Sequence, residues 1–158
     1  MMGKEWGFAL LGLWFVWRLS ELALQDVRCG LLYDRLVLIV ALSAVYPWTL
    51  GRNSLDDMLA GALLGGGLFW GIRWLSCGGM GWGDVKLAGA IGLWLGVKPM
   101  VVAVLLAFGL GGIVALGLLL WRGYSCSAKL PFGPFLTIGA SFAYWFGMDC
   151  WQWYERLL

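Results

Sequence analysis

The sequence predicts an all-α fold, a polytopic membrane bundle of about six transmembrane helices that forms a single domain over residues 1–158. Composition is the first reason: 61% of the side chains are hydrophobic and 13% are charged, whereas a soluble domain has about 25% charged residues. The mean hydropathy is +0.82. The second reason is that the apolar segments suit helices crossing a hydrocarbon core of about 30 Å and exceed the strands of a membrane barrel.

Polar, glycine and proline residues divide the chain into six apolar segments. The first resembles a signal peptide, but Glu21 stands where a cleavage site needs small residues, so we interpret it as a retained helix. The second begins after Asp34, the third follows the polar stretch "GRNSLDD", and the short fourth follows "SCGGMGWGD". Pro99 and Pro131 lie near the starts of the last two, where a missing N–H costs nothing. The segments cover roughly residues 6–25, 35–50, 57–75, 85–97, 99–121 and 132–150, with connections too brief for a second domain.

Charge and cysteine content exclude several classes of function. A net charge of +2 without a run of Lys or Arg argues against nucleic acid as a partner and leaves lipids and other membrane proteins. The chain has no histidine and no CxxC pair, so we expect no metal, no cofactor and free thiols. The oligomeric state stays open. The four cysteines are Cys29, Cys77, Cys126 and Cys150.

Counting the segments places two aspartates on one side of the membrane. Asp26 closes the first segment and Asp84 opens the fourth, so two complete crossings separate them. Loops on that side carry Arg28, Arg35, Arg73, Lys86, Arg122 and Lys129, whereas the other side carries Lys4, Arg52, Lys98 and Arg156. By the positive-inside rule this bias places the two aspartates at the cytoplasmic face and both termini outside.

A pair of acids near hydrocarbon is a candidate catalytic site. An ionised carboxylate there is costly, and such groups usually face the interior of a bundle. If Asp26 and Asp84 converge, repulsion and desolvation leave one protonated and one ionised near neutral pH. An aspartic peptidase requires this state, because the ionised acid takes a proton from the attacking water while the protonated acid hydrogen-bonds the carbonyl oxygen and later helps to protonate the leaving amine.

Simpler interpretations remain for each charged residue. Asp84 directly precedes an apolar run, so an interpretation as a helix N-cap fits it as well as a catalytic one. In the same simpler interpretation, Asp26 is a solvated loop residue beside Arg28, and the Lys86 side chain extends to the lipid headgroups. The solvated-loop interpretation applies more strongly to Asp34, Asp56 and Asp57.

Glycines surround the second acid. Gly79, Gly81 and Gly83 allow backbone conformations closed to other residues and let an extended substrate approach the carboxylate without a Cβ in the way. Glycines elsewhere in the apolar segments suit close helix packing in lipid.

Four stretches together resemble the type IV prepilin peptidases, membrane aspartic peptidases marked by GxGD. "GMGWGDVKLAGAIGLWLG" resembles their glycine-aspartate block, and "LQDVRCGLLYD" resembles the segment of the first family aspartate, which matches Asp26. "KLPFGPFLTIG" resembles the start of the last helix, and "DDMLAGALLGGGLFWGIRWL" the helix before the GxGD block. The presenilin-type peptidases share the tetrapeptide, but their surrounding motifs are absent.

The resemblance implies Asp26 and Asp84 as the catalytic pair, with Gly81, Gly83, Lys86 and Arg28 in substrate-binding or supporting roles. The implied substrate is a type IV prepilin or type II secretion pseudopilin, cut at the cytoplasmic face of the bacterial inner membrane. Family members commonly have proline where this chain has Tyr33, and longer members add a cysteine-containing methylation domain that nothing here matches. The resemblance therefore implies a minimal peptidase, and it leaves open whether any N-methyltransferase activity remains.

Two other hypotheses fit the same residues. In the first, the chain is a small transporter or membrane assembly subunit whose buried acids bind a cation or relay protons. Alternatively it is a family member that folds without cutting, for which Tyr33 is the one hint.

Overall fold

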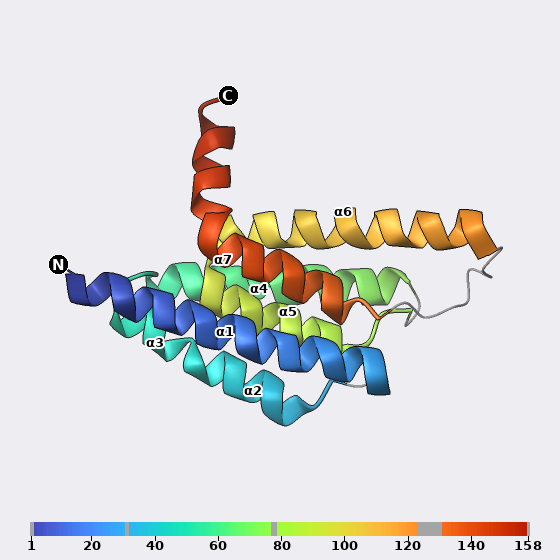
Figure 1. Cartoon of the computed structure of the whole chain (residues 1–158), viewed down its shortest axis with the longest axis horizontal. Helices are drawn as coiled ribbons and strands as arrows, with labels where there is room; N and C mark the ends of the chain where they lie inside the picture. Colours follow the sequence, from blue (N-terminus) through green and yellow to red (C-terminus); the bar gives the residue numbers. More distant parts are fainter. Residues whose placement is uncertain (1, 31, 77–78, 123–130, 158) are drawn as a thin grey trace.

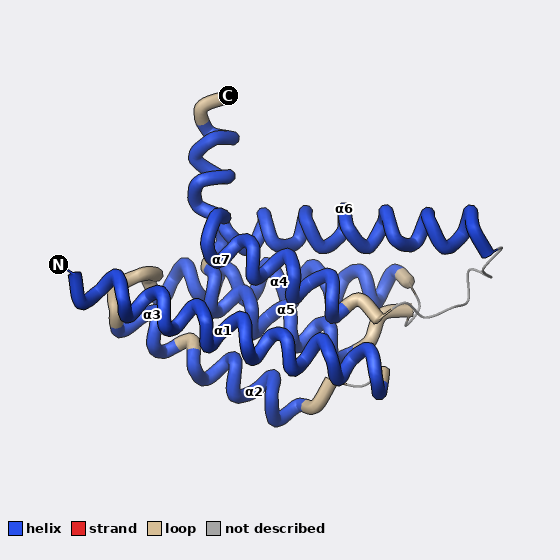
Figure 2. Tube along the Cα trace, in the orientation of Figure 1, coloured by secondary structure: helices blue, strands red, loops and turns tan. Residues whose placement is uncertain are grey.

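The computed structural model describes residues 2–30, 32–76, 79–122 and 131–157, and every regular element within these ranges is a helix (Figure 2). Most of the helices lie side by side along the bundle, whereas the C-terminal part of the last helix stands across them and leaves the bundle (Figure 1). The all-α membrane bundle is thus confirmed, while Cys77, Cys126 and Lys129 lie outside the described residues. The helices are α1 (Met2–Cys29), α2 (Asp34–Ser43), α3 (Val45–Thr49), α4 (Leu55–Leu75), α5 (Trp82–Leu95), α6 (Val97–Arg122) and α7 (Gly133–Glu155).

The second predicted segment is broken into α2 and α3. Pro47 lacks the N–H that would bond to the carbonyl of Ser43, and its ring crowds that carbonyl, so α2 ends at Ser43. The Ser43 hydroxyl bonds to the carbonyl of Val40 at 2.7 Å. Two short helices, which follow one another along the bundle, therefore take the place of the single predicted segment (Figure 1).

Three of the described helices are long and apolar enough to cross a membrane. They cover Trp6–Arg28, Leu55–Leu75 and Val97–Leu118. Large apolar side chains such as Leu63, Trp74 and Leu120 are mostly exposed on the bundle, as a lipid-facing surface requires. The chain is therefore a membrane protein.

Close contact between α4 and α5 depends on glycine. A Cβ on Gly61 would lie 2.5 Å from the carbonyl oxygen of Gly92, so a side chain there would push the helices apart. Deeper in the core, the ring of Trp94 stacks on Phe15 at 4.5 Å and donates to the carbonyl of Val40 at 2.7 Å. Trp94 thus joins α5 to α1 and α2 in the middle of the bundle.

Asp57 corrects one prediction from the sequence. It was expected to be a solvated loop residue, but it lies in the first turn of α4 and accepts a hydrogen bond from the Val97 N–H at 3.1 Å. That bond satisfies a free donor at the start of α6, beside Gly96 with a positive φ of 75°. Asp56 is exposed, although it too lies in the helix. Asp57 therefore braces the α5–α6 turn at the end of the bundle opposite Asp84.

Candidate active site

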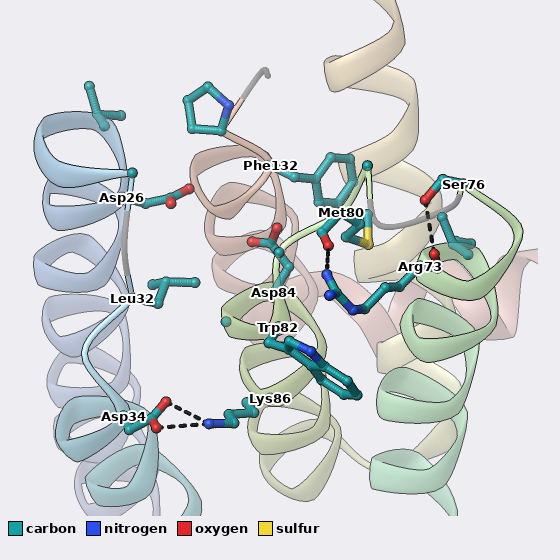
Figure 3. A pocket seen from close by; sticks show the side chains of 17 residues that line it. Asp26, Leu32, Asp34, Arg73, Ser76, Met80, Trp82, Asp84, Lys86 and Phe132 are labelled. Carbon is teal, nitrogen blue, oxygen red and sulfur yellow. Dashed lines mark hydrogen bonds and ion pairs between the residues drawn. The ribbon is translucent and has the colours of Figure 1, made fainter. Parts of the chain in front are cut away.

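A cavity of about 990 Å³ opens at the end of the bundle where α1 and α4 finish and α2, α5 and α7 begin. Asp26 and Asp84 both line it, and their carboxyl groups are directed into the same space (Figure 3). Apolar side chains form much of the remaining wall, among them Val27, Leu32, Ile72, Met80, Trp82 and Phe132. The cavity thus combines two acids with an apolar lining.

Asp26 is held by the N-terminus of another helix. It lies in the last turn of α1, is 7% exposed, and its Oδ2 accepts a hydrogen bond from the Gly133 N–H at 3.0 Å. Gly133 is the first residue of α7, where the backbone N–H groups and the helix dipole favour a negative charge. A Cβ at Gly133 would lie 2.5 Å from the same Oδ2. Only glycine therefore lets this N–H approach the carboxylate so closely.

Asp84 lies inside α5 and is not its N-cap. The helix begins at Trp82, its N-cap is Gly81, and no side chain caps it, so the capping interpretation is wrong. Asp84 is 8% exposed, and its Oδ1 has no hydrogen-bond partner among the described residues. This residue lies outside the three helices that are long enough to cross a membrane. Burial, and to a lesser degree the charge of Asp26, raise the pKa of Asp84 to about 6, while the Gly81 N–H acts in the opposite direction.

The neighbouring glycines serve packing more than unusual backbone geometry. None of Gly79, Gly81 and Gly83 has a positive φ; among the described glycines only Gly30, Gly51 and Gly96 do. A Cβ on Gly83 would lie 2.8 Å from the Cβ of Leu32, which leads into α2. Gly83 therefore admits another part of this chain beside Asp84, in addition to any substrate.

The predicted supporting cations lie in different places. Lys86 lines the cavity and donates to both carboxylate oxygens of Asp34 at 2.8 Å, an exposed ion pair. Arg28 is exposed and does not line the cavity. The structure thus brings Lys86 to the cavity wall, paired with Asp34, and leaves Arg28 outside it.

This arrangement suits acid–base chemistry on a bound chain. Two buried carboxyl groups in one cavity, one with a pKa near 6, can hold unequal protonation states. No group of three His, Cys, Asp or Glu side chains within the described ranges could hold a metal ion. The cavity could admit an extended segment of polypeptide beside the two acids.

Comparison with known proteins identifies the family. Residues 13–116, more than half of the chain, match the type IV leader peptidase family. The chain belongs to this family. It is similar to the prepilin leader peptidase/N-methyltransferase of Aeromonas hydrophila, with 36% identity over 159 residues, which is 97% of this chain and 54% of the relative. It is also similar to the protein of the same name from Pseudomonas aeruginosa, with 34% identity over 137 residues, 83% of this chain and 47% of the relative.

The chain spans about half the length of the curated relatives that it matches. No solved structure matches it. The part that matches the type IV leader peptidase family includes both Asp26 and Asp84 and ends before Gly133.

Sequence reasoning missed two residues of this candidate site. Gly133 lies in the "PFGP" stretch, which marked the start of the last segment but carried no role for the glycine itself. Arg73 was counted only as a positive charge on one side of the membrane, yet it lines the cavity. The signal available for Arg73 was a cation seven residues before Met80 of the GxGD stretch.

Proposed function

We propose that this chain is a membrane aspartic endopeptidase that removes leader peptides from type IV prepilin or pseudopilin-like precursors. Asp26 and Asp84 are the proposed catalytic pair. The observation that carries the proposal is that both acids, each less than a tenth exposed, line one cavity. Membership of the type IV leader peptidase family supports the reaction class.

The two acids take different roles in this mechanism. Asp26 accepts the Gly133 N–H as a carboxylate does, so we assign it as the base that takes a proton from the attacking water. Asp84, whose raised pKa of about 6 keeps a fraction of it protonated near neutral pH, is the acid that donates a hydrogen bond to the peptide carbonyl oxygen. As the tetrahedral intermediate collapses, the proton gained by Asp26 passes to the leaving amine and the C–N bond breaks.

The position of the cavity fits a bond at the edge of the membrane. Because it opens at the end of the bundle, a substrate helix can stay in the bilayer while the adjoining residues extend toward the acids. Helical backbone hides its carbonyl groups, and a glycine at the junction extends readily. We place this end at the cytoplasmic face of the inner membrane, since its described loops and helix ends carry Arg28, Arg35, Arg73 and Lys86.

Cleavage of a co-expressed prepilin tests the proposal. Asp26→Asn and Asp84→Asn keep the volume of each side chain and an acceptor oxygen, including the one facing Gly133, but cannot exchange the proton. Each variant should cleave at least about 100-fold more slowly than the parent. Asp56→Asn is the matched control, because Asp56 is exposed and lies at the start of α4, at the other end of the bundle, so it should cleave at the parental rate.

Two outcomes would overturn the assignment. If both cavity variants cleave at the parental rate, Asp26 and Asp84 are not catalytic. If no variant and no parent cleaves, but both acids are required for ion flux in proteoliposomes, the chain is a transporter.

A further inference from the structure

We propose that Arg73 is a positioning residue that holds the loop before α5 and thereby places Asp84 in the cavity. The inference rests on the proposed peptidase function and adds a residue to it. Arg73 lies in the last turn of α4 and lines the same cavity as the two acids.

Arg73 contacts the chain on both sides of Gly81. Its guanidinium donates a hydrogen bond to the carbonyl oxygen of Met80, and its Cζ lies 4.7 Å from the centre of the Trp82 ring (Figure 3). Gly81 is the N-cap of α5. One side chain from α4 therefore contacts both the loop immediately before α5 and the first residue of α5.

The loop needs such a contact because its own sequence gives it little rigidity. Gly79, Gly81 and Gly83 alternate with Met80 and Trp82, and glycine leaves the backbone more conformational freedom than any other residue. The hydrogen bond from the Gly79 N–H to the carbonyl of Ser76 fixes the loop where it leaves α4. The Arg73 contacts act at the other end of the loop, nearest Asp84.

Asp84 lies in the same helical turn as Trp82, the last of the residues that Arg73 contacts. Trp82 begins α5 and Asp84 is two residues later, so a shift at Trp82 carries the carboxyl group with it. Misplacing a catalytic group by about 1 Å costs roughly 100-fold in rate. Holding the first residue of α5 is thus an efficient way to hold the acid.

The chemistry of the contact requires arginine. A planar guanidinium can lie over an indole ring while one of its N–H groups points to a carbonyl oxygen, whereas a lysine ammonium is a compact point charge. Within the described ranges Arg73 forms no ion pair, so its charge meets a backbone dipole and an aromatic face. Arg73→Lys therefore keeps the charge and removes the paired contact.

Kinetics and hydrogen exchange together test the inference, with prepilin as substrate. Arg73→Lys should lower kcat about 10- to 100-fold with KM within about 2-fold of the parent, because the acid moves while the substrate contacts stay. Amide exchange at residues 80–83 should become faster. Trp82→Leu should also lower kcat. The double variant should lose little more activity than the less active of the two single variants, because both substitutions disrupt the same contact. Arg35→Lys is the matched control, since Arg35 is exposed at the same end of the bundle and should change neither measurement.

Several results would overturn the inference. A rise in KM with kcat unchanged would make Arg73 a substrate-binding residue, and slower cleavage with unchanged exchange would exclude positioning through the loop. Parental values in both measurements would leave Arg73 without a role. If the parent itself cleaves no prepilin, the proposed function fails, and unchanged exchange in Arg73→Lys would still reject the contact as the support of the loop.

Discussion

Gly133→Ala should separate catalysis from folding. The new Cβ would lie 2.5 Å from Oδ2 of Asp26, against 3.4 Å or more for ordinary van der Waals contact. Gly133 has no positive φ, so alanine suits its backbone. The conflict is with the Asp26 side chain, whose Cγ and Cβ would lie 3.0 and 3.2 Å from the new Cβ, and it is most severe at the carboxyl oxygen. Because Asp26 ends in a rotatable carboxyl, we expect that group to move and α7 to stay in place.

The size of the effect follows from the overlap. Restoring ordinary contact requires the oxygen to move by about 0.9 Å, which also lengthens its 3.0 Å hydrogen bond to the Gly133 N–H. A displacement of this size at a reacting group predicts a loss of roughly 100-fold in kcat, or about 2.7 kcal/mol of transition-state stabilisation.

The assay compares prepilin cleavage and thermal unfolding in detergent. Gly112→Ala is the matched control, because a Cβ at Gly112 in α6 meets nothing within 4 Å. We expect Gly133→Ala to lose activity while its Tm stays within about 2 °C of this control, since a carboxyl rotation costs little packing. Parental activity with an unchanged Tm would show that the position of Asp26 against α7 does not matter for cleavage, and the proposed role of the Gly133 N–H would be wrong.

Three further predictions concern stability. Gly61→Ala should lower the unfolding free energy by about 1–3 kcal/mol, because the new Cβ meets the backbone of Gly92, which cannot move aside as a side chain does. Denaturant unfolding measures this loss, and a loss below about 1 kcal/mol would contradict the prediction. Asp57→Ala should cost about 1–2 kcal/mol in the same measurement by freeing the Val97 N–H, with Asp57→Asn recovering part of the loss. The raised pKa of Asp84 means that the folded chain binds an extra proton between about pH 4 and 6, so this group destabilises the fold as pH rises through that window. Asp84→Asn should therefore have a higher Tm than the parent at pH 7.5 and nearly the same Tm at about pH 3, below the unfolded-state pKa, and equal values at both pH values would refute the shift.

The helical bundle and the placement of the two acids at one end could be predicted from the sequence, because both follow from counting the apolar segments. Apolar segments of membrane-spanning length have few folding alternatives, and each crossing reverses the direction of the chain. The crossings between Asp26 and Asp84 therefore predicted a shared end, and the structure has both residues lining one cavity. Even the segment broken before Pro47 preserves this count, since α2 and α3 follow one another from the cavity end of the bundle toward the other end (Figure 1).

Contacts between distant residues could not be counted in this way. The bond from Val97 to Asp57 joins residues 40 positions apart, and it depends on how closely α4 packs against α5. The pairing of Lys86 with Asp34 spans 52 positions and depends on where α2 begins after the turn. Asp84 looked like an N-cap because the apolar run starts after it, but the helix had already begun at Trp82. Helix boundaries vary by such small steps, and a role assigned from the boundary changes with them.

The two acids are carried by different pairs of helices. Asp26 lies on α1, which packs mainly on α7, and Asp84 lies on α5, which packs mainly on α4. Each acid is also held from the partner helix of its own pair, Asp26 through Gly133 of α7 and the loop before Asp84 through Arg73 of α4.

Two ring contacts join these pairs. At the cavity wall Phe69 of α4 packs on Phe132, the N-cap of α7, with 5.5 Å between the ring centres. The other contact lies away from the cavity. The Trp94 ring, near the C-terminal end of α5, stacks on Phe15 of α1 at 4.5 Å and is fully buried, so it fixes α5 against α1 in the middle of the bundle. Toward the cavity, the helix ends carry the acids about 11 residues from Phe15 and 10 from Trp94, roughly three helical turns away. A small change in the tilt of one helix is amplified over that length, so the tight core alone does not determine the spacing of the carboxyl groups. The local contacts of Gly133 and Arg73 therefore add to the core packing in setting the geometry of the two acids.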